Sequence, residues 1–207
     1  IVVAIALCAV CLACARGLFT GRLLAGHDAP AYPVTQHQFD LNIREGVLFP
    51  RWAPDMRYGY GHPQLQFRPP TLHYLGEPLY LLTGHPFLSL NLTLVGLVFV
   101  ACLGMYLLAR VYLRPAWAAL AATAYITCHY YLADLYLRGA YYEISAMACL
   151  PWILWAQARL LEGTRTVAPF LLGALAWTGA FCGHPATATF LAPLAAAHAV
   201  VSWRNTR

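Results

Sequence analysis

The sequence contains no lysine, and charged residues of all kinds make up only 10% of its 207 positions. A soluble domain of this length carries about a quarter charged residues, so this scarcity excludes an ordinary soluble domain. Hydrophobic residues reach 60%, which predicts an integral membrane protein. The thirteen basic residues are all arginines and lie dispersed along the chain, so that they form no basic stripe for nucleic acid.

The sequence also lacks the short motifs of several enzyme classes. It has no HExxH, P-loop or GxSxG pattern. Its seven cysteines lie inside or beside apolar runs, where cysteine acts as a small hydrophobic residue. Cys8, Cys11 and Cys14 repeat every three residues without a nearby histidine or acid, so we expect them to pack and not to bind a metal.

One long polar segment, 26–70, interrupts the hydrophobic chain. It holds four of the eight acids and three of the eight histidines: Asp28, Asp40, Glu45, Asp55, His27, His37 and His62. Within it, residues 35–48 predict a short surface helix. The apolar run 72–82 that follows is broken by Glu77-Pro78 and predicts an interfacial or re-entrant segment.

We expect about six membrane helices, one before the polar segment and five after it. The predicted spans are a truncated first helix in 1–24 and the segments 88–109, 115–132, 144–158, 167–182 and 186–203. The expected fold is an all-α integral membrane protein with one polytopic domain over 1–207. Residues 25–86 form its large first loop, and 87–207 contain its five further helices. The chain opens without Met inside an apolar run, so we interpret it as a fragment of a longer protein.

The arginines between the helices predict an orientation. Those at 110 and 114, at 159 and 165, and at 204 and 207 follow alternate helix ends, and therefore lie on one side of the membrane. The positive-inside rule makes this side cytoplasmic. The long first loop and the turns 133–143 and 183–185 then lie outside with seven of the eight acids, and we expect the bacterial inner membrane.

Asp28 is the first candidate for chemistry, because it follows the first helix by a short linker. At the outer membrane surface, neighbouring apolar helices would raise the pKa of its carboxyl and suit it to act as a general base. The alternative is a helix cap or a solvated loop charge.

A second candidate group lies in the turn 133–143. Asp134 and Arg138 are four residues apart and would pair on a helical turn. The alternative is that Arg138 binds a phosphate, to which a guanidinium donates two hydrogen bonds. Glu143 is either a favourable acid at a helix start or a further carboxylate of a site.

Aromatic and histidine side chains form a third group. In Arg57-Tyr-Gly-Tyr-Gly-His-Pro63, Tyr60 and His62 lie in a glycine-rich loop that would stack on a sugar ring, or belong to an interfacial aromatic belt. His184, in Gly-His-Pro, is a turn residue or a site residue on the same side. His37 and Asp40 complete the candidates for substrate binding.

Several short motifs carry a family resemblance over residues 20–160. They are Gly46-Val-Leu-Phe-Pro-Arg-Trp-Ala-Pro54, Gly59-Tyr-Gly-His-Pro63, Arg68-Pro-Pro70, Leu137-Arg-Gly-Ala-Tyr-Tyr-Glu143 and Leu150-Pro-Trp-Ile-Leu-Trp155. The chain resembles the bacterial membrane proteins called 6-pyruvoyl-tetrahydropterin synthase-related, which are similar to the GT-C superfamily of membrane glycosyltransferases and to YfhO-type proteins.

The resemblance implies transfer of a sugar from a polyprenyl-phosphate donor to an envelope acceptor, with inversion, on the outer side of the bilayer. It implies that Asp28 deprotonates the acceptor hydroxyl while Arg138 and His184 hold the leaving phosphate, with Asp40, Asp134 and Glu143 as secondary carboxylates. Many of these enzymes carry two adjacent acids where this chain has His27-Asp28, which leaves a requirement for a divalent metal open.

Two other functions fit the same pattern. A transporter or flippase for lipids or glycans would need a groove, although ion coupling is disfavoured because charged residues lie at the predicted helix ends. A non-catalytic protein that binds lipid-linked glycans would use the same fold. Whether Asp28 is essential separates these two functions from the enzyme.

Overall fold

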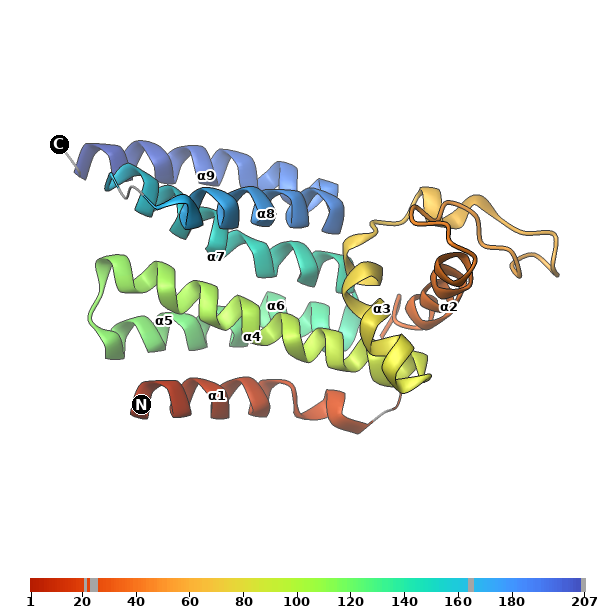
Figure 1. Cartoon of the computed structure of the whole chain (residues 1–207). Coiled ribbons are helices and arrows are strands. Elements are labelled where there is room, and N and C mark those ends of the chain that lie inside the picture. Colours follow the sequence, from red (N-terminus) through yellow and green to blue (C-terminus); the bar gives the residue numbers. More distant parts are fainter. Residues whose placement is uncertain (21, 23–25, 164–165, 206–207) are drawn as a thin grey trace.

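The computed structural model describes residues 1–20, 22, 26–163 and 166–205, which form helices and no β-strand. Figure 1 shows a bundle of long helices and, at one end of it, a smaller part built from α2, α3 and a projecting loop. The all-α class expected from the sequence is therefore confirmed.

The bundle contains seven helices among the described residues. They are α1 (Val2–Cys14), α4 (Pro86–Tyr112), α5 (Pro115–Thr127), α6 (His129–Ala133), α7 (Tyr141–Leu161), α8 (Val167–Gly183) and α9 (Pro185–Asn205). Proline occupies the first turn of α4 and α5, where its missing N–H leaves no helical hydrogen bond unmade. His85 caps α4, because its Nδ1 accepts a hydrogen bond from the backbone N–H of Leu88 at 3.3 Å.

Three of these helices, α4, α7 and α9, are long and apolar enough to cross a membrane. This confirms a membrane protein in outline, while the six-span topology stays a prediction. The predicted span 115–132 is not one helix: α5 ends at Thr127, Cys128 is extended, and the short α6 follows. The chain then makes one π-helical turn, η3 (Asp134–Arg138), before α7 begins.

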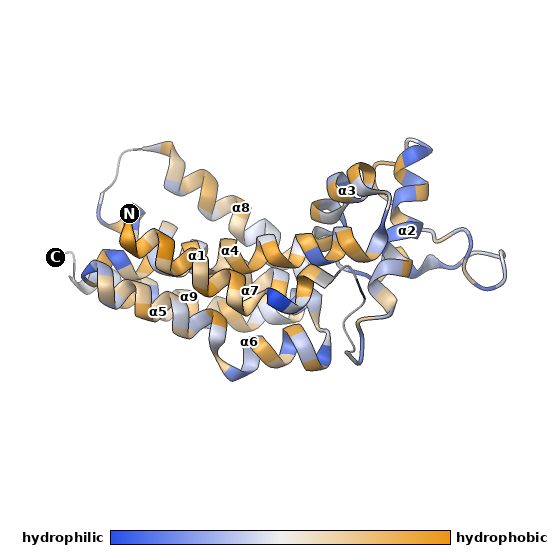
Figure 2. Cartoon of the chain, turned by 90° about the horizontal axis from the view of Figure 1, so that it is seen from below, coloured by the Kyte–Doolittle hydropathy of each residue, from blue (hydrophilic) through white to orange (hydrophobic). Residues whose placement is uncertain are grey.

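Hydropathy differs between the bundle and the smaller part built from α2, α3 and the projecting loop. Figure 2 shows hydrophobic residues along the bundle and more hydrophilic residues in α2 and the projecting loop. Arg110, Arg114 and Arg159 lie at or next to the helix ends remote from α2 and α3. Of the other arginines used to predict the orientation, Arg165, Arg207 and the side chain of Arg204 lie outside the described residues.

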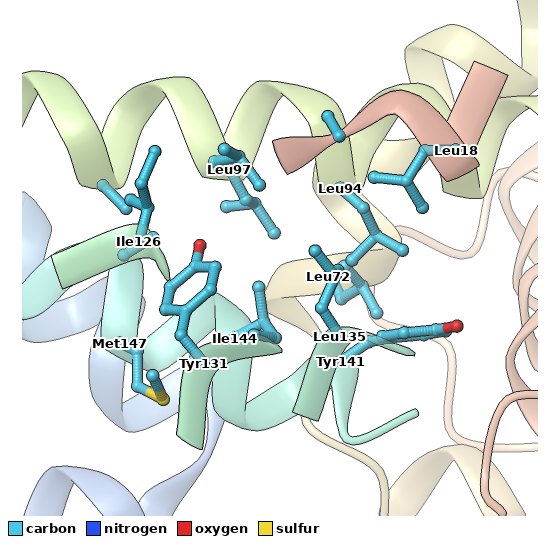
Figure 3. Packing of buried hydrophobic residues seen from close by; sticks show 14 of the residues in the cluster. Leu18, Leu72, Leu94, Leu97, Ile126, Tyr131, Leu135, Tyr141, Ile144 and Met147 are labelled. Atoms are coloured by element: carbon cyan, nitrogen blue, oxygen red, sulfur yellow. The ribbon is translucent and has the colours of Figure 1, made fainter. Parts of the chain in front are cut away.

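The main core lies between α4, α7 and the α5–α6 segment. Figure 3 shows Tyr131 and Ile126 packed beside Leu97 and Ile144, and all four side chains are buried. Helices α4 and α7 also approach closely at Gly104, where an added Cβ would lie 2.5 Å from the indole nitrogen of Trp152. A small residue at such a crossing lets the side chain of one helix approach the backbone of the other.

The helix predicted over 35–48 exists, but it begins earlier and is not a surface helix. Helix α2 (Ala31–Arg44) packs against α3 and buries polar side chains, among them Gln36, Gln38 and Asp40. The chain leaves α2 through Gly46, whose φ of +83° is readily available only to glycine.

The predicted break at Glu77-Pro78 is wrong. Helix α3 (Thr71–Thr83) continues through Pro78, and Glu77 lies buried on its inner face. Proline in this position removes one backbone hydrogen bond, a loss that the packing of α3 against α4 and α2 offsets. Between α2 and α3 the chain forms a hairpin over 53–62 and a 3₁₀ turn, η2 (Pro63–Gln66).

Candidate functional site

A cavity of about 560 Å³ lies where the smaller part meets the bundle. Its polar lining consists of His62, Gln64 (in the 3₁₀ turn η2), Arg68, Tyr142 and His184. These residues come from the end of the hairpin, the segment before α3, the first turn of α7 and the turn between α8 and α9. Two of the sequence candidates, His62 and His184, are therefore brought together, and we call this space the polar cavity.

The polar cavity presents donors as well as acceptors. The Nδ1 atom of His184 accepts hydrogen bonds from the backbone N–H and the hydroxyl of Thr187, at 3.3 and 2.6 Å. The proton of a neutral His184 ring must then lie on Nε2, which makes that atom a donor. Arg68 lies over the ring of Tyr142, with its guanidinium carbon 6.0 Å from the ring centroid, and pairs with no carboxylate among the described residues.

Asp28 lies on an exposed bend before α2. Its backbone N–H donates to the carbonyl oxygen of Arg138 at 3.0 Å, and the N–H of His27 donates to that of Leu137 at 3.3 Å. The two segments cross closely because Gly139 has a φ of +68° and no side chain: an added Cβ would lie 2.8 Å from the nitrogen of Ala29. The side chain of Asp28 is exposed, as in the alternative of a solvated loop charge.

Tyr32 connects the bend to the polar cavity. Its hydroxyl oxygen accepts a hydrogen bond from the backbone N–H of Tyr142 at 3.4 Å. The pKa of Tyr32 is raised to about 12, chiefly by burial; hydrogen bonds from the backbone of Tyr142 and Tyr141 lower it, the carboxylate of Asp28 raises it and the guanidinium of Arg68 lowers it. The charges of Asp28 and Arg68 therefore act on this hydroxyl in opposite directions.

Arg138 is occupied by carboxylates. Its guanidinium pairs with Asp134 and also donates to Glu143, at 2.9 Å to Oε1 and 3.4 Å to Oε2. Tyr130 donates its hydroxyl to the same Oε2 at 2.6 Å. Of the two alternatives for Arg138, the ion pair is the one formed, and its guanidinium is not free to bind a phosphate in this arrangement.

Asp134 is buried completely beneath that pair. Burial, followed by the negative charge of Glu143, raises the pKa of Asp134 to about 6, although Arg138 lowers it. Its Oδ2 atom has no hydrogen-bond partner among the described residues. Asp134 is therefore a positioning residue, because its buried carboxylate holds the guanidinium of Arg138 through the ion pair.

A buried chain of hydrogen bonds runs from the polar cavity into the α2–α3 interface. Tyr142 donates to Nε2 of His73 at 2.7 Å, Nδ1 of His73 donates to Oε1 of Gln36 at 2.9 Å, and Nε2 of Gln36 donates to Glu77 at 2.7 Å. The directions follow because the amide nitrogen of Gln36 also donates to the carbonyl oxygen of His73. Burial, helped by the charge of Arg68, lowers the pKa of His73 to about 3, so the ring is neutral.

The acidic end of this chain, Glu77, is about half protonated at neutral pH. Burial first, and then the negative charge of Asp40, raise the pKa of Glu77 to about 7, while the hydrogen bond from Gln36 lowers it. Oε1 of Glu77 is buried with no partner among the described residues. Sequence reasoning missed His73, Gln36 and Glu77; the available signal was the spacing of four residues between His73 and Glu77, which places both on one face of a helix.

The remaining sequence candidates do not line the polar cavity. His37 contacts the hydroxyl of Tyr80 through Nδ1 at 3.1 Å, and Asp40 accepts two hydrogen bonds from Nε of Arg44 at 2.7 and 2.8 Å. Tyr60 lies at the exposed tip of the hairpin. No group of three or more metal-binding side chains occurs among the residues described by the structure.

No protein-family model matches the chain, and comparisons with characterised proteins and with solved structures found no match. The resemblance to GT-C-type proteins therefore stays a prediction. The functional argument depends on the geometry of the polar cavity and of the Asp28 bend.

Proposed function

We propose that this chain is a glycosyltransferase-like membrane protein that takes a sugar from a polyprenyl-phosphate donor at the surface formed by the Asp28 bend and the polar cavity. The observation that carries the proposal is the presence, at one end of a bundle of apolar helices, of an exposed carboxylate, two histidines and a guanidinium with no carboxylate partner among the described residues. A sugar phosphate attached to a lipid needs this combination at a membrane surface.

In this proposal Asp28 is the general base. Its carboxylate takes the proton from the acceptor hydroxyl, whose oxygen forms a bond to the anomeric carbon of the sugar. The bond between that carbon and the phosphate oxygen breaks, and the phosphate leaves with the electron pair. Attack and departure on opposite faces of the sugar produce inversion.

Arg68 replaces Arg138 as the residue that stabilises the leaving phosphate. Arg138 already contacts two carboxylates, whereas Arg68 has none and lies on the wall of the polar cavity. A guanidinium donates two parallel hydrogen bonds to a phosphate, and its positive charge offsets the charge that develops as the bond breaks. Nε2–H of His184 is a second donor for the same group.

The proposed location is a bacterial inner membrane with this surface on the extracytoplasmic side. Arg110, Arg114 and Arg159 at the opposite ends of the helices support it, because short cytoplasmic loops are enriched in basic residues.

The test is the substitution Asp28→Asn in the full-length protein, with Glu45→Gln as the matched control. Glu45 is exposed just after α2 and is remote in sequence from the crossing at Gly139, so its change removes the same charge without touching the bend. Lipid-linked sugars and envelope glycans are measured by mass spectrometry in cells that carry each variant, the wild type or a deletion.

We expect Asp28→Asn to reproduce the deletion at normal protein level, with accumulation of the unused lipid-linked sugar, and Glu45→Gln to behave as the wild type. Wild-type glycans in the Asp28→Asn cells, together with a glycan defect in the deletion, would reject the general base. That result would favour binding or transport of lipid-linked glycans without transfer.

A further inference from the structure

Arg68 separates the polar cavity from a second hollow of different character. This groove has a volume of about 760 Å³ and lies between the chain after α2, the face of α3 that carries Thr71, Tyr74 and Leu75, and the end of α8. Its walls are largely apolar and include Phe39, Tyr74 and Cys182. Its two basic residues are Arg51 and Arg68, and Arg68 is the only residue that lines both hollows among those described.

Arg51 and Arg68 lie beside apolar walls without an anionic partner among the described residues. A guanidinium beside apolar walls is stabilised strongly by an anion that accepts its hydrogen bonds, and phosphate matches its planar geometry. The two arginines therefore favour an anionic ligand, and the apolar walls favour one that carries a hydrocarbon chain.

An exposed strip of α8 leads away from the groove along the bundle. Thr178 and Cys182 line the groove, and Leu171 and Leu175 precede them at intervals of four and three residues, so all four side chains share one side of the helix. All four are exposed in the chain. From Leu171 to Cys182 this strip is about 16 Å long at 1.5 Å per residue. It extends from the arginines toward the opposite end of the bundle.

We propose that this groove holds the lipid portion of the donor: the phosphate lies between Arg51 and Arg68, and the hydrocarbon chain follows the exposed strip of α8. The sugar then enters the polar cavity on the other side of Arg68. This assignment rests on the proposed function for the identity of the ligand, while the groove and its two arginines stand without it. It adds Arg51 as a residue that positions the phosphate.

The test uses photo-crosslinking of the purified full-length protein in lipid nanodiscs. The probe is a long-chain alkyl phosphate with a diazirine in the chain; the matched probe is the corresponding alcohol, and inorganic phosphate is the competitor. Labelled peptides are mapped by mass spectrometry. We expect the phosphate probe to label the peptide of α8 at least tenfold more than the alcohol, and inorganic phosphate to compete only at far higher concentration.

Two variants separate the headgroup from the chain. Arg51→Gln is expected to lower labelling of α8 about tenfold, because it removes charge-assisted hydrogen bonds to the phosphate. The control Arg57→Gln removes the same charge from the exposed hairpin and is expected to label as the wild type. Thr178→Trp, at an exposed position, places a bulky ring in the strip and is expected to lower labelling while both arginines remain.

Equal labelling by the phosphate and the alcohol would overturn the proposal, as would wild-type labelling in Arg51→Gln. The failure of the proposed function has a different signature. If Arg51→Gln loses labelling while Asp28→Asn leaves the cellular glycans unchanged, the groove binds a lipid phosphate and the transfer reaction is rejected. If Asp28→Asn abolishes transfer while Arg51→Gln labels normally, the reaction stands and the groove is rejected.

Discussion

The hydroxyl of Tyr142 donates to Nε2 of His73 at 2.7 Å, across the boundary between the bundle and the α2–α3 part. Tyr142 lines the polar cavity, whereas His73 is fully buried on α3. The proton of this hydroxyl is committed to His73, so Tyr142 has no hydroxyl proton to donate to a ligand. Its geometry depends on residues that a ligand does not touch.

Replacing His73 is expected to destabilise the protein. His73→Leu leaves the hydroxyl of Tyr142 and Oε1 of Gln36 buried without partners, at a cost of about 1–3 kcal/mol for each group. Thermal unfolding of the purified protein in detergent would measure the loss. His37→Leu is the control: His37 is exposed and should change stability by less than about 1 kcal/mol. Equal melting temperatures for the two variants would contradict the buried chain.

The raised pKa of Glu77 predicts a stability that falls as pH rises. An unfolded glutamate loses its proton near pH 4.5, whereas the folded Glu77 keeps it up to about pH 7. Between pH 4.5 and 7 the folded state therefore binds more protons than the unfolded state. The contribution of Glu77 to the free energy of unfolding is complete below pH 4.5 and declines as the pH rises to 7. Glu77→Gln, which cannot ionise, should flatten this decline by on the order of 1 kcal/mol. Unfolding followed from pH 4.5 to 8 would show whether the two curves converge in acid.

Gly139 allows a more local test of the Asp28 bend. Gly139→Ala adds a Cβ 2.8 Å from the nitrogen of Ala29 at a φ of +68°, so both the backbone and the crossing are strained. Gly84→Ala has a similar φ of +63° and nothing within 4 Å of its added Cβ, which limits its cost to about 1–2 kcal/mol. We expect Gly139→Ala to lose more stability and to impair transfer, measured as for Asp28→Asn. A loss no larger than that of Gly84→Ala would show that the crossing is not tight.

The pairing beneath Arg138 predicts non-additive substitutions. Arg138→Gln removes the cation that faces the buried Asp134 and should cost about 1–3 kcal/mol, limited because Asp134 can take up a proton. Asp134→Asn in addition removes the buried charge, so the double variant should regain part of that stability. Denaturant unfolding of the single and double variants forms the cycle. Strict additivity would mean that the pair contributes nothing.

The sequence was sufficient to predict the all-α membrane class, because runs such as that of α4 are too long and too apolar for a soluble helix. It was also sufficient to predict that His62 and His184 lie at one end of the bundle, since both lie in short segments next to helix ends. The ion pair of Asp134 with Arg138 was among the stated alternatives because their spacing suits one helical turn.

The buried polar interface could not be predicted in the same way. Gln36 and Glu77 are 41 positions apart, and only the packing of α2 on α3 shows that each is the other's partner. Viewed locally, a polar helix indicates a surface and a Glu-Pro pair indicates a break. The role of Arg68 was hidden for a related reason: it differs from Arg138 in having no carboxylate partner among the described residues, which is a property of the folded chain.

The hydrogen bond from the N–H of Tyr142 to the hydroxyl of Tyr32 joins residues 110 positions apart. During synthesis α2 and α3 leave the ribosome well before α7, and until α7 arrives Tyr32 and His73 lack their hydrogen bonds to Tyr142. The α2–α3 part therefore completes its core only after the bundle is assembled, so its formation is a late, non-local step. A chain that stops before α7 would present these polar groups unpaired, and quality-control proteases would find an unfinished surface there.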